Sequence, residues 1–119
     1  MPIKIEEGKS PKGTRLMVAR VQGNVTLAEA EAMGKLLQPG QAFEQATVLS
    51  IVASDTVYEP AARRHFQSFN GHFRKMGTVV TNPLVRAAIN FMLHVTGRRN
   101  AMKLFNTEAE ALAWLDASE

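Results

Sequence analysis

The segment ATVLSIVAS, residues 46–54, decides the fold class because it has the composition of a fully buried strand. It is short, almost continuously apolar and rich in β-branched residues, which is typical of a strand covered on both faces. Such strands occur mainly in parallel sheets that carry helices on their two sides. The segment therefore predicts an α/β domain.

The sequence before this segment supplies another strand and a helix. RLMVARVQG, residues 15–23, has the apolar content of a strand and ends at a Gly-Asn pair. In TLAE, Thr26 and Glu29 have the spacing of a capping box, in which the threonine accepts from an early backbone N–H. We expect a helix to begin there and to end at QPG, residues 38–40.

The sequence after residue 54 continues the alternation of helix and strand. We expect a helix from about Pro60 to Lys75, followed by a strand at GTVVT, residues 77–81. Asn82-Pro83 is a well-formed helix start, with asparagine as the N-cap and proline in the first turn. Two sets of apolar residues are expected to face the core, one at helical spacing after residue 60 and one near the C-terminus: Phe66, Phe69, Phe73 and Met76, then Ala109, Leu112, Ala113 and Leu115.

The last segments complete the order of elements. The helix after Pro83 ends at Gly97, AMKLF (101–105) is a strand, and TEAE (107–110) is a second capping box. With IKIEE (3–7) as an antiparallel edge strand, the order predicts a mostly parallel sheet of four or five strands covered by four helices. We expect residues 1–119 to form a single domain.

Composition excludes several classes of protein. The chain of 119 residues contains no cysteine, which rules out disulfides, thiol catalysis and thiolate metal sites. Its start carries no apolar segment of a secretory signal, and no run approaches the roughly 18 apolar residues of a membrane span. We therefore expect a soluble, cytoplasmic protein.

Charge is distributed unevenly along the chain. The net charge is only +3, but no Asp or Glu occurs from Pro60 to Thr107. A basic surface of this kind attracts an acidic protein, a nucleic acid or an anionic lipid, unless the bases neutralise the acidic helices of the same chain. The sequence has no nucleic-acid reader motif, and its phenylalanines have the spacing of a buried face, so nucleic acid is the minor alternative.

With these elements in this order, the chain resembles the STAS family, and within it the small SpoIIAA-like bacterial branch. The resemblance covers essentially the whole chain and is carried by VVTNPLVRAAINFM (79–92) and by GRRNAMKLFNTEAEALAWL (97–115). It implies the α/β fold described above and a non-catalytic role in bacterial regulation through binding of a protein partner.

The resemblance also draws attention to ASDTVYEP, residues 53–60. In anti-sigma-factor antagonists, the equivalent loop carries a serine that a partner kinase phosphorylates. Here no glycine follows a serine or threonine, so the family's motif is absent, and Ser54 and Thr56 are the nearest hydroxyls. A phospho-switch at these residues is one alternative; the other is that Asp55 or Thr56 merely caps a turn.

Catalysis has little support in the sequence. The chain lacks a nucleophile elbow, a phosphate-binding loop and an H-E-x-x-H motif. His65 and His72 are seven residues apart on one expected helix, which separates their backbones by about 10 Å and prevents shared binding of one zinc ion. We expect no enzyme activity, no cofactor and no metal site.

The helix after Pro83 is the most unusual surface element. Arg86, Asn90 and His94 form one narrow polar stripe, and its other positions are apolar. The helix either lies deep in the core or is covered by a homodimer partner, another protein, a lipophilic ligand or a membrane surface. The interaction surface predicted for a partner consists of this helix and a basic rim: Val85, Ile89, Phe91, Met92, Arg63, Arg64, Arg98 and Arg99.

Overall fold

The computed structural model of the protein describes residues 2–67, 73–96 and 101–117. Its strands are β1 (Ile3–Lys9), β2 (Arg15–Val21), β3 (Asn24–Val25), β4 (Thr47–Val52), β5 (Val57–Tyr58), β6 (Lys75–Val79) and β7 (Met102–Phe105). Its helices are α1 (Leu27–Leu36), α2 (Pro60–Gln67), α3 (Pro83–Thr96) and α4 (Glu108–Asp116). The alternation of strands and helices confirms the predicted fold class.

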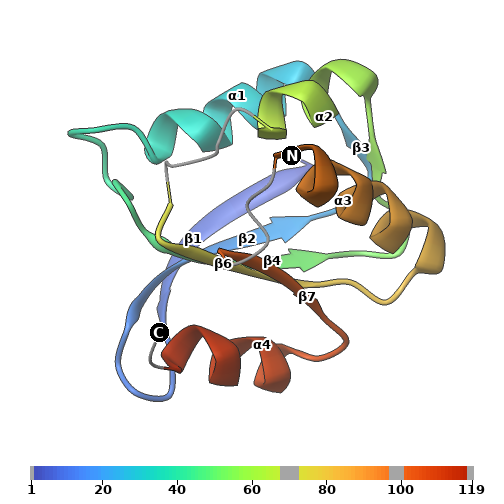
Figure 1. Cartoon of the computed structure of the whole chain (residues 1–119). Helices are drawn as coiled ribbons and strands as arrows, with labels where there is room; N and C mark the ends of the chain where they lie inside the picture. Colours follow the sequence, from blue (N-terminus) through green and yellow to red (C-terminus); the bar gives the residue numbers. More distant parts are fainter. Residues whose placement is uncertain (1, 68–72, 97–100, 118–119) are drawn as a thin grey trace.

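Five strands form the main sheet in the order β1-β2-β4-β6-β7 (Figure 1). The hairpin partner β1 is antiparallel to β2, and the four strands from β2 to β7 are parallel to one another. The predicted antiparallel edge strand is therefore present. A second, two-stranded sheet, β3 with β5, was not predicted because each of its strands has only two residues.

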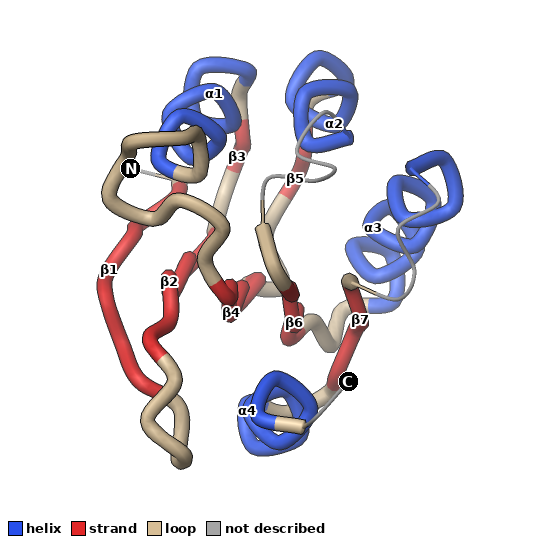
Figure 2. Tube along the Cα trace, turned by 60° about the vertical axis from the view of Figure 1, so that its left-hand side comes forward, coloured by secondary structure: helices blue, strands red, loops and turns tan. Residues whose placement is uncertain are grey.

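The helices are divided unequally between the two faces of the sheet. From β2 to β7 the parallel strands advance in one direction, and right-handed crossovers then place every connecting helix on the same side. Figure 2 shows α1, α2 and α3 on one face and α4 alone on the other. Covering the second face therefore depends on a single short helix.

The core follows the two-residue alternation of the strands. In β4, Val48 and Val52 contribute to the core beneath α1, α2 and α3, whereas Leu49 contributes to the smaller core beneath α4. Both faces of β4 are covered, as its composition predicts.

Two expectations about element boundaries are wrong. The predicted helix from Pro60 to Lys75 ends earlier, because Lys75 and Met76 belong to β6. Phe73 precedes that strand and is buried in the core, and Phe69 lies outside the described residues. The apolar spacing therefore came partly from the following strand, which the helical pattern cannot distinguish over so few residues.

The buried face of α4 is also rotated from the expected one. Ala111 and Leu115 are buried, whereas Ala109 and Ala113 are exposed. The helix packs closely on Gly77 of β6, where an added Cβ would lie 3.4 Å from Leu115 Cγ. Thr107 caps the helix as predicted and accepts a hydrogen bond from the backbone N–H of Glu110.

Polar contacts fix both sides of the C-terminal end of α4. The ammonium group of the buried Lys75 donates to the carbonyl oxygens of Trp114 and Ala117, at 2.8 and 3.3 Å. It also lies 4.4 Å from the centroid of the Trp114 ring. A cation is favourable at the C-terminal end of a helix, and here it gives a second donor to the Trp114 carbonyl oxygen, which also accepts from the backbone N–H of Ala117.

Asp116 connects the same end of α4 to the β1–β2 hairpin. Its carboxylate accepts hydrogen bonds from the hydroxyls of Ser10 and Thr14 and from the backbone N–H of Lys12. The hydrogen bond from Ser10 is the main cause that lowers the pKa of Asp116. These contacts hold residues 102 to 106 positions apart in the sequence.

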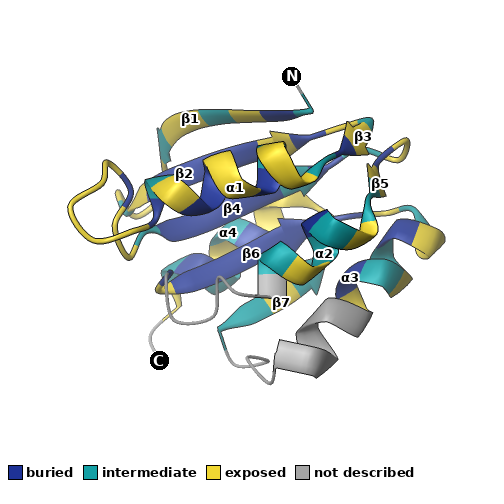
Figure 3. Cartoon of the chain, turned by 90° about the horizontal axis from the view of Figure 1, so that it is seen from above, coloured by how far each residue is buried: buried dark blue, intermediate teal, exposed yellow. Residues whose placement is uncertain are grey.

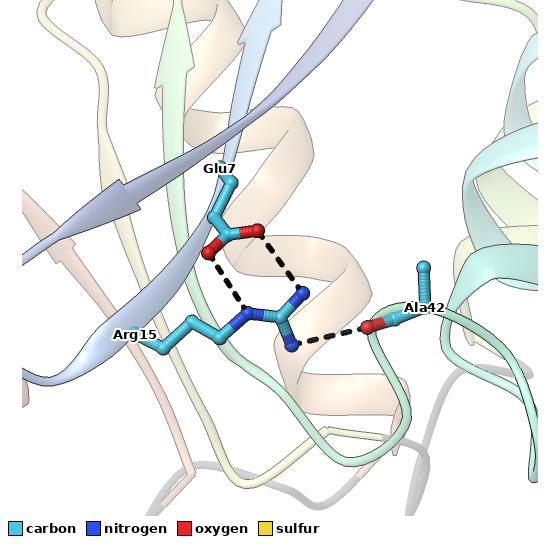
Figure 4. A network of polar contacts seen from close by, with 3 residues as sticks. All are labelled: Glu7, Arg15 and Ala42. Atoms are coloured by element: carbon cyan, nitrogen blue, oxygen red, sulfur yellow. Dashed lines mark hydrogen bonds and ion pairs between the residues drawn. The ribbon is translucent and has the colours of Figure 1, made fainter.

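Arg15 connects the hairpin to the loop that follows α1, on the side of the sheet opposite α4 (Figure 4). Its guanidinium pairs with Glu7 at 3.2 Å and donates to the carbonyl oxygen of Ala42 at 3.0 Å. It also lies over the Phe43 ring, 4.8 Å from the ring centroid. The hairpin thus contacts both α4 and the loop that follows α1.

Asp116→Asn should destabilise the protein near neutral pH, because the amide cannot accept all three hydrogen bonds. Since folding lowers the pKa of Asp116, its contribution to stability is complete above the usual carboxyl range and disappears as pH falls through the lowered pKa. The difference in urea midpoint between wild type and variant should therefore be constant from pH 7 to about 5 and shrink below about pH 4. Glu44→Gln, an exposed substitution in the loop before β4, is the control. A difference that persists unchanged at pH 3 would contradict this account.

Candidate interaction site

The carboxyl ends of the parallel strands gather the exposed loops at one edge of the sheet. Strands β2, β4, β6 and β7 end there, and each is followed by a segment that leads into a helix. We name these segments, residues 22–27, 53–59, 80–84 and 106–107, the carboxyl edge. In α/β sheets, ligands and partners commonly bind outside this edge, because loops and helix N-termini meet there.

Exposed apolar side chains are concentrated at the carboxyl edge. Across the part of the chain that the structure describes, the exposed large apolar residues are Leu27, Val57 and Leu84, at 39%, 60% and 83% of full exposure. Leu27 begins α1, Val57 lies in β5 and Leu84 is in the first turn of α3. Figure 3 shows exposed positions at the ends of these elements, on the side where β3 and β5 lie.

Of the two hydroxyls predicted as phosphorylation sites, only Ser54 is accessible. Thr56 is 4% exposed, and its hydroxyl donates to the carbonyl oxygen of Val21 at 3.3 Å. The interpretation of Thr56 as a modifiable residue is therefore corrected: its side chain is part of the interior and fixes the loop to the end of β2. Ser54 lies in an exposed turn.

Further contacts hold the loop after β4 in place. Asp55 accepts a hydrogen bond from the backbone N–H of Gly23 at 3.4 Å, and Glu59 accepts one from the Asn24 side chain at 2.7 Å. The backbone N–H of Val57 donates to the Gly23 carbonyl oxygen at 2.8 Å. The loop is thus anchored along its length to residues 21–25.

Asn82 and Arg86 join three segments of the carboxyl edge. Asn82 caps α3 as predicted, accepting from the backbone N–H of Leu84 at 2.9 Å, and it also donates to the carbonyl oxygen of Ser54 at 2.7 Å. Arg86 donates to the carbonyl oxygen of Val80 and to the side chain of Asn106, at 2.9 and 3.1 Å. Arg86, the first residue of the polar stripe expected on α3, therefore makes hydrogen bonds within the domain.

The predicted interaction surface on α3 requires a correction. Val85 and Ile89 are buried in the core beneath α1, α2 and α3, so they support the helix from behind and are not on its surface. Their four-residue spacing is that of the inward stripe of a helix packed on a sheet. The exposed positions described on α3 include Leu84, Ala87 and Asn90.

The other predicted surface residues are only partly described. Arg64 is exposed on α2 and Arg63 is half-buried. The side chains of Phe91 and Met92, and all of Arg98 and Arg99, lie outside the described residues.

Tyr58 is a partly buried titratable residue in the described part of the chain. Burial raises the pKa of the Tyr58 phenol well above its usual range, and its ring packs edge-on against Phe66. Within residues 2–67, 73–96 and 101–117, no three His, Asp or Glu side chains are grouped so as to hold a metal ion. No helix in those ranges has the length and apolar character needed to cross a bilayer.

Residues 16–119 match the model of the family described as a domain of unknown function, DUF7793. The chain belongs to this family. No curated protein matches this DUF7793 domain significantly.

Two solved structures share the fold of this DUF7793 domain. One is an uncharacterized protein of the DUF3478 family with a SpoIIAA-like fold from Shewanella loihica PV-4, with a TM-score of 0.67, 19% identity and coverage of 95% of this chain and 93% of that one. The other is an anti-sigma factor antagonist from Mycobacterium paratuberculosis, with a TM-score of 0.61, 16% identity and coverage of 97% and 95%. The predicted STAS-like, SpoIIAA-like fold is confirmed.

The sequence did not reveal Val57 and Leu84 as surface residues of this DUF7793 domain. Both occur among apolar neighbours, and their exposure depends on the two-residue strand β5 and on the orientation of α3. A signal was present for Leu84: it follows the Asn82-Pro83 helix start, and side chains in a first turn at the end of a sheet often remain outside the core.

Removal of the Thr56 hydroxyl should destabilise the domain without altering its surface. Thr56→Val leaves the Val21 carbonyl oxygen without this donor and should lower the free energy of unfolding by about 1 kcal/mol. Thr56→Glu should be far more damaging, because it places a carboxylate in the interior. Ser54→Ala and Ser54→Glu serve as exposed controls and should change the urea midpoint little. Equal tolerance of glutamate at both positions would contradict the buried position of Thr56.

Proposed function

We propose that this DUF7793 domain is a non-catalytic protein-binding module that acts in bacterial regulation. Its contact surface is the carboxyl edge, and its partner is another protein or a second copy of the chain. The observation that carries the proposal is the location of Leu27, Val57 and Leu84 at one edge of the sheet. The shared fold with an anti-sigma factor antagonist is consistent with this class of function.

Exposed apolar residues gain free energy when a partner covers them. A single exposed leucine is ordinary, but here the large apolar side chains exposed among the described residues all lie on segments of the same edge, which supports placing a docking surface there. Leu84 is 83% exposed, so nearly all of its side chain is available for contact. Complete burial of one such side chain contributes roughly 1.5–3 kcal/mol.

The carboxyl edge is also well ordered for binding. Asn82 and Arg86 connect its segments to one another through hydrogen bonds of 2.7 to 3.1 Å, and Thr56 connects one segment to the end of β2 at 3.3 Å. A surface that is already fixed loses less conformational entropy on binding. The exposed Arg64, on the helix that follows β5, extends the edge with a positive charge and favours a partner that carries carboxylates.

Ser54 gives the proposed site a point of control. Its side chain is exposed in the turn after β4, and a phosphate there would add negative charge beside Asp55 at the carboxyl edge. Such a modification would alter the electrostatics of the surface that includes Val57 and Leu84. Phosphorylation of Ser54 is the form of the phospho-switch that remains compatible with the burial of Thr56.

A photo-reactive amino acid at position 84 should cross-link the domain to one defined protein species in its host. The same amino acid at position 113, exposed on α4 at the opposite face, is the matched control. We expect adducts at 84 and not at 113, and we expect Val57→Glu to remove the adduct while the melting temperature stays within about 2 °C, because the residue is exposed.

The mass of the adduct distinguishes the partners. An adduct with twice the mass of the chain indicates a homodimer. An adduct with any other single, protein-sized increase in mass indicates another protein. Both outcomes support the proposal. Lipid adducts at position 84 would instead favour a carrier or sensor of an apolar or anionic lipid. Equal labelling at 84 and 113 would contradict the assignment of the carboxyl edge as the contact surface.

A further inference from the structure

The side chain of Asn82 makes two contacts of opposite sense at the carboxyl edge. Its carbonyl oxygen accepts from the backbone N–H of Leu84 at 2.9 Å, and its amide nitrogen donates to the carbonyl oxygen of Ser54 at 2.7 Å. Helix capping explains only the first contact, because any short side chain with an oxygen can accept that hydrogen bond. The second contact reaches a loop 28 residues away in the sequence and requires a donor.

The turn at Ser54 is held from two sides. On one side, Thr56 donates its hydroxyl hydrogen to the Val21 carbonyl oxygen, and its backbone N–H donates to the carbonyl oxygen of Ala53 at 3.2 Å. On the other side, Asn82 donates to the carbonyl oxygen of Ser54 itself. The first attachment is buried, whereas Ser54 and Asp55 are exposed, so a surface event can reach the contact from Asn82 and the longer contact of Asp55 with the Gly23 N–H. Of these two, the contact from Asn82 leads to α3.

The first turn of α3 is likewise held from two sides. Arg86 fixes it to residues 80 and 106 through hydrogen bonds to the carbonyl oxygen of Val80 and the side chain of Asn106. Asn82 fixes it to the turn at Ser54 and at the same time accepts from the N–H of Leu84, the most exposed large apolar residue described. One amide group therefore orients both the exposed turn and the exposed leucine.

We propose that Asn82 is a positioning residue that couples the turn at Ser54 to the first turn of α3. A charge or a partner group placed on the turn displaces the Ser54 carbonyl oxygen and releases the Asn82 amide. The orientation of Leu84 in the first turn of α3 then changes. This inference rests on the proposed role of the carboxyl edge in protein binding and names how that surface is controlled.

Asn82→Asp separates the two contacts. The carboxylate still accepts from the Leu84 N–H, and negative charge is favourable at a helix N-terminus, so α3 should remain capped. It has no hydrogen to donate, and its charge repels the Ser54 carbonyl oxygen. Asn82→Ser, which also keeps a capping oxygen and lacks the amide, is the second variant. Asn90→Asp, the same chemical change at an exposed position of α3, is the matched control.

Hydrogen exchange can be measured by NMR on the isolated domain. The amides of Thr56 and Val57 report on the turn at Ser54, and the amide of Leu84 reports on the first turn of α3. Asn82→Asp should accelerate exchange at Thr56 and Val57 by about three- to ten-fold, the usual effect of losing one hydrogen bond, and leave Leu84 protected. Asn90→Asp should change none of the three rates. Unchanged exchange at Thr56 and Val57 in both Asn82 variants would overturn the inference.

A double-mutant cycle tests the transmission from Ser54 to Leu84. Ser54→Asp should accelerate exchange at the Leu84 amide in the wild-type background, because an Asn82 amide released from Ser54 can rotate away from the Leu84 N–H. The effect should be absent in Asn82→Asp, whose carboxylate caps that N–H without any contact to Ser54. Equal acceleration in both backgrounds would show that the signal does not pass through Asn82. Because these rates are measured without a partner, a failure here is distinct from a failure of cross-linking at position 84.

Discussion

The steady advance of the parallel strands in one direction is the constraint on which the rest of the structure depends. It places three connecting helices on one face of the sheet and leaves the other face to α4 (Figure 2). It also brings the starts of all four helices, and the loops before them, to the carboxyl edge. The candidate interaction surface is thus a consequence of topology, and the individual side chains determine only what it can bind.

The unequal division of helices explains why polar side chains hold α4 in place. A helix of nine residues gains limited apolar contact, and here Ala111 and Leu115 are its buried residues. Lys75 satisfies carbonyl groups at its C-terminal end, and Asp116 accepts three hydrogen bonds from the β1–β2 hairpin. These contacts lie at the amino ends of the strands, away from the carboxyl edge.

Most of the fold could be predicted from the sequence because the strongest signals are local. The apolar run around β4, the capping residues Thr26 and Thr107 and the Asn82-Pro83 pair each specify an element without knowledge of its neighbours. The end of α2 could not be predicted, because Phe73 and Met76 continue a helical spacing by coincidence while packing as parts of the sheet core. The pair β3–β5 is too short to leave a pattern.

The candidate site was harder to predict because exposure is a property of the assembled fold. Val85, Ile89 and Leu84 are similar residues within one helix, and only the packing of α3 on the sheet buries the first two and exposes the third. Thr56 and Ser54 are similar hydroxyls two residues apart, but Ser54 is exposed and Thr56 is buried, where it donates to the Val21 carbonyl oxygen. The cap formed by Asn82 was predictable, whereas its contact with Ser54 depends on how two distant loops meet.

Native mass spectrometry of the protein purified without detergent from its own host tests the central claim most directly. Wild type and Leu84→Glu should be compared at equal concentration. The account predicts a doubled mass or a retained protein partner for the wild type and a bare monomer for the folded variant. A wild-type monomer with nothing bound, or a complex that Leu84→Glu leaves intact, would contradict it.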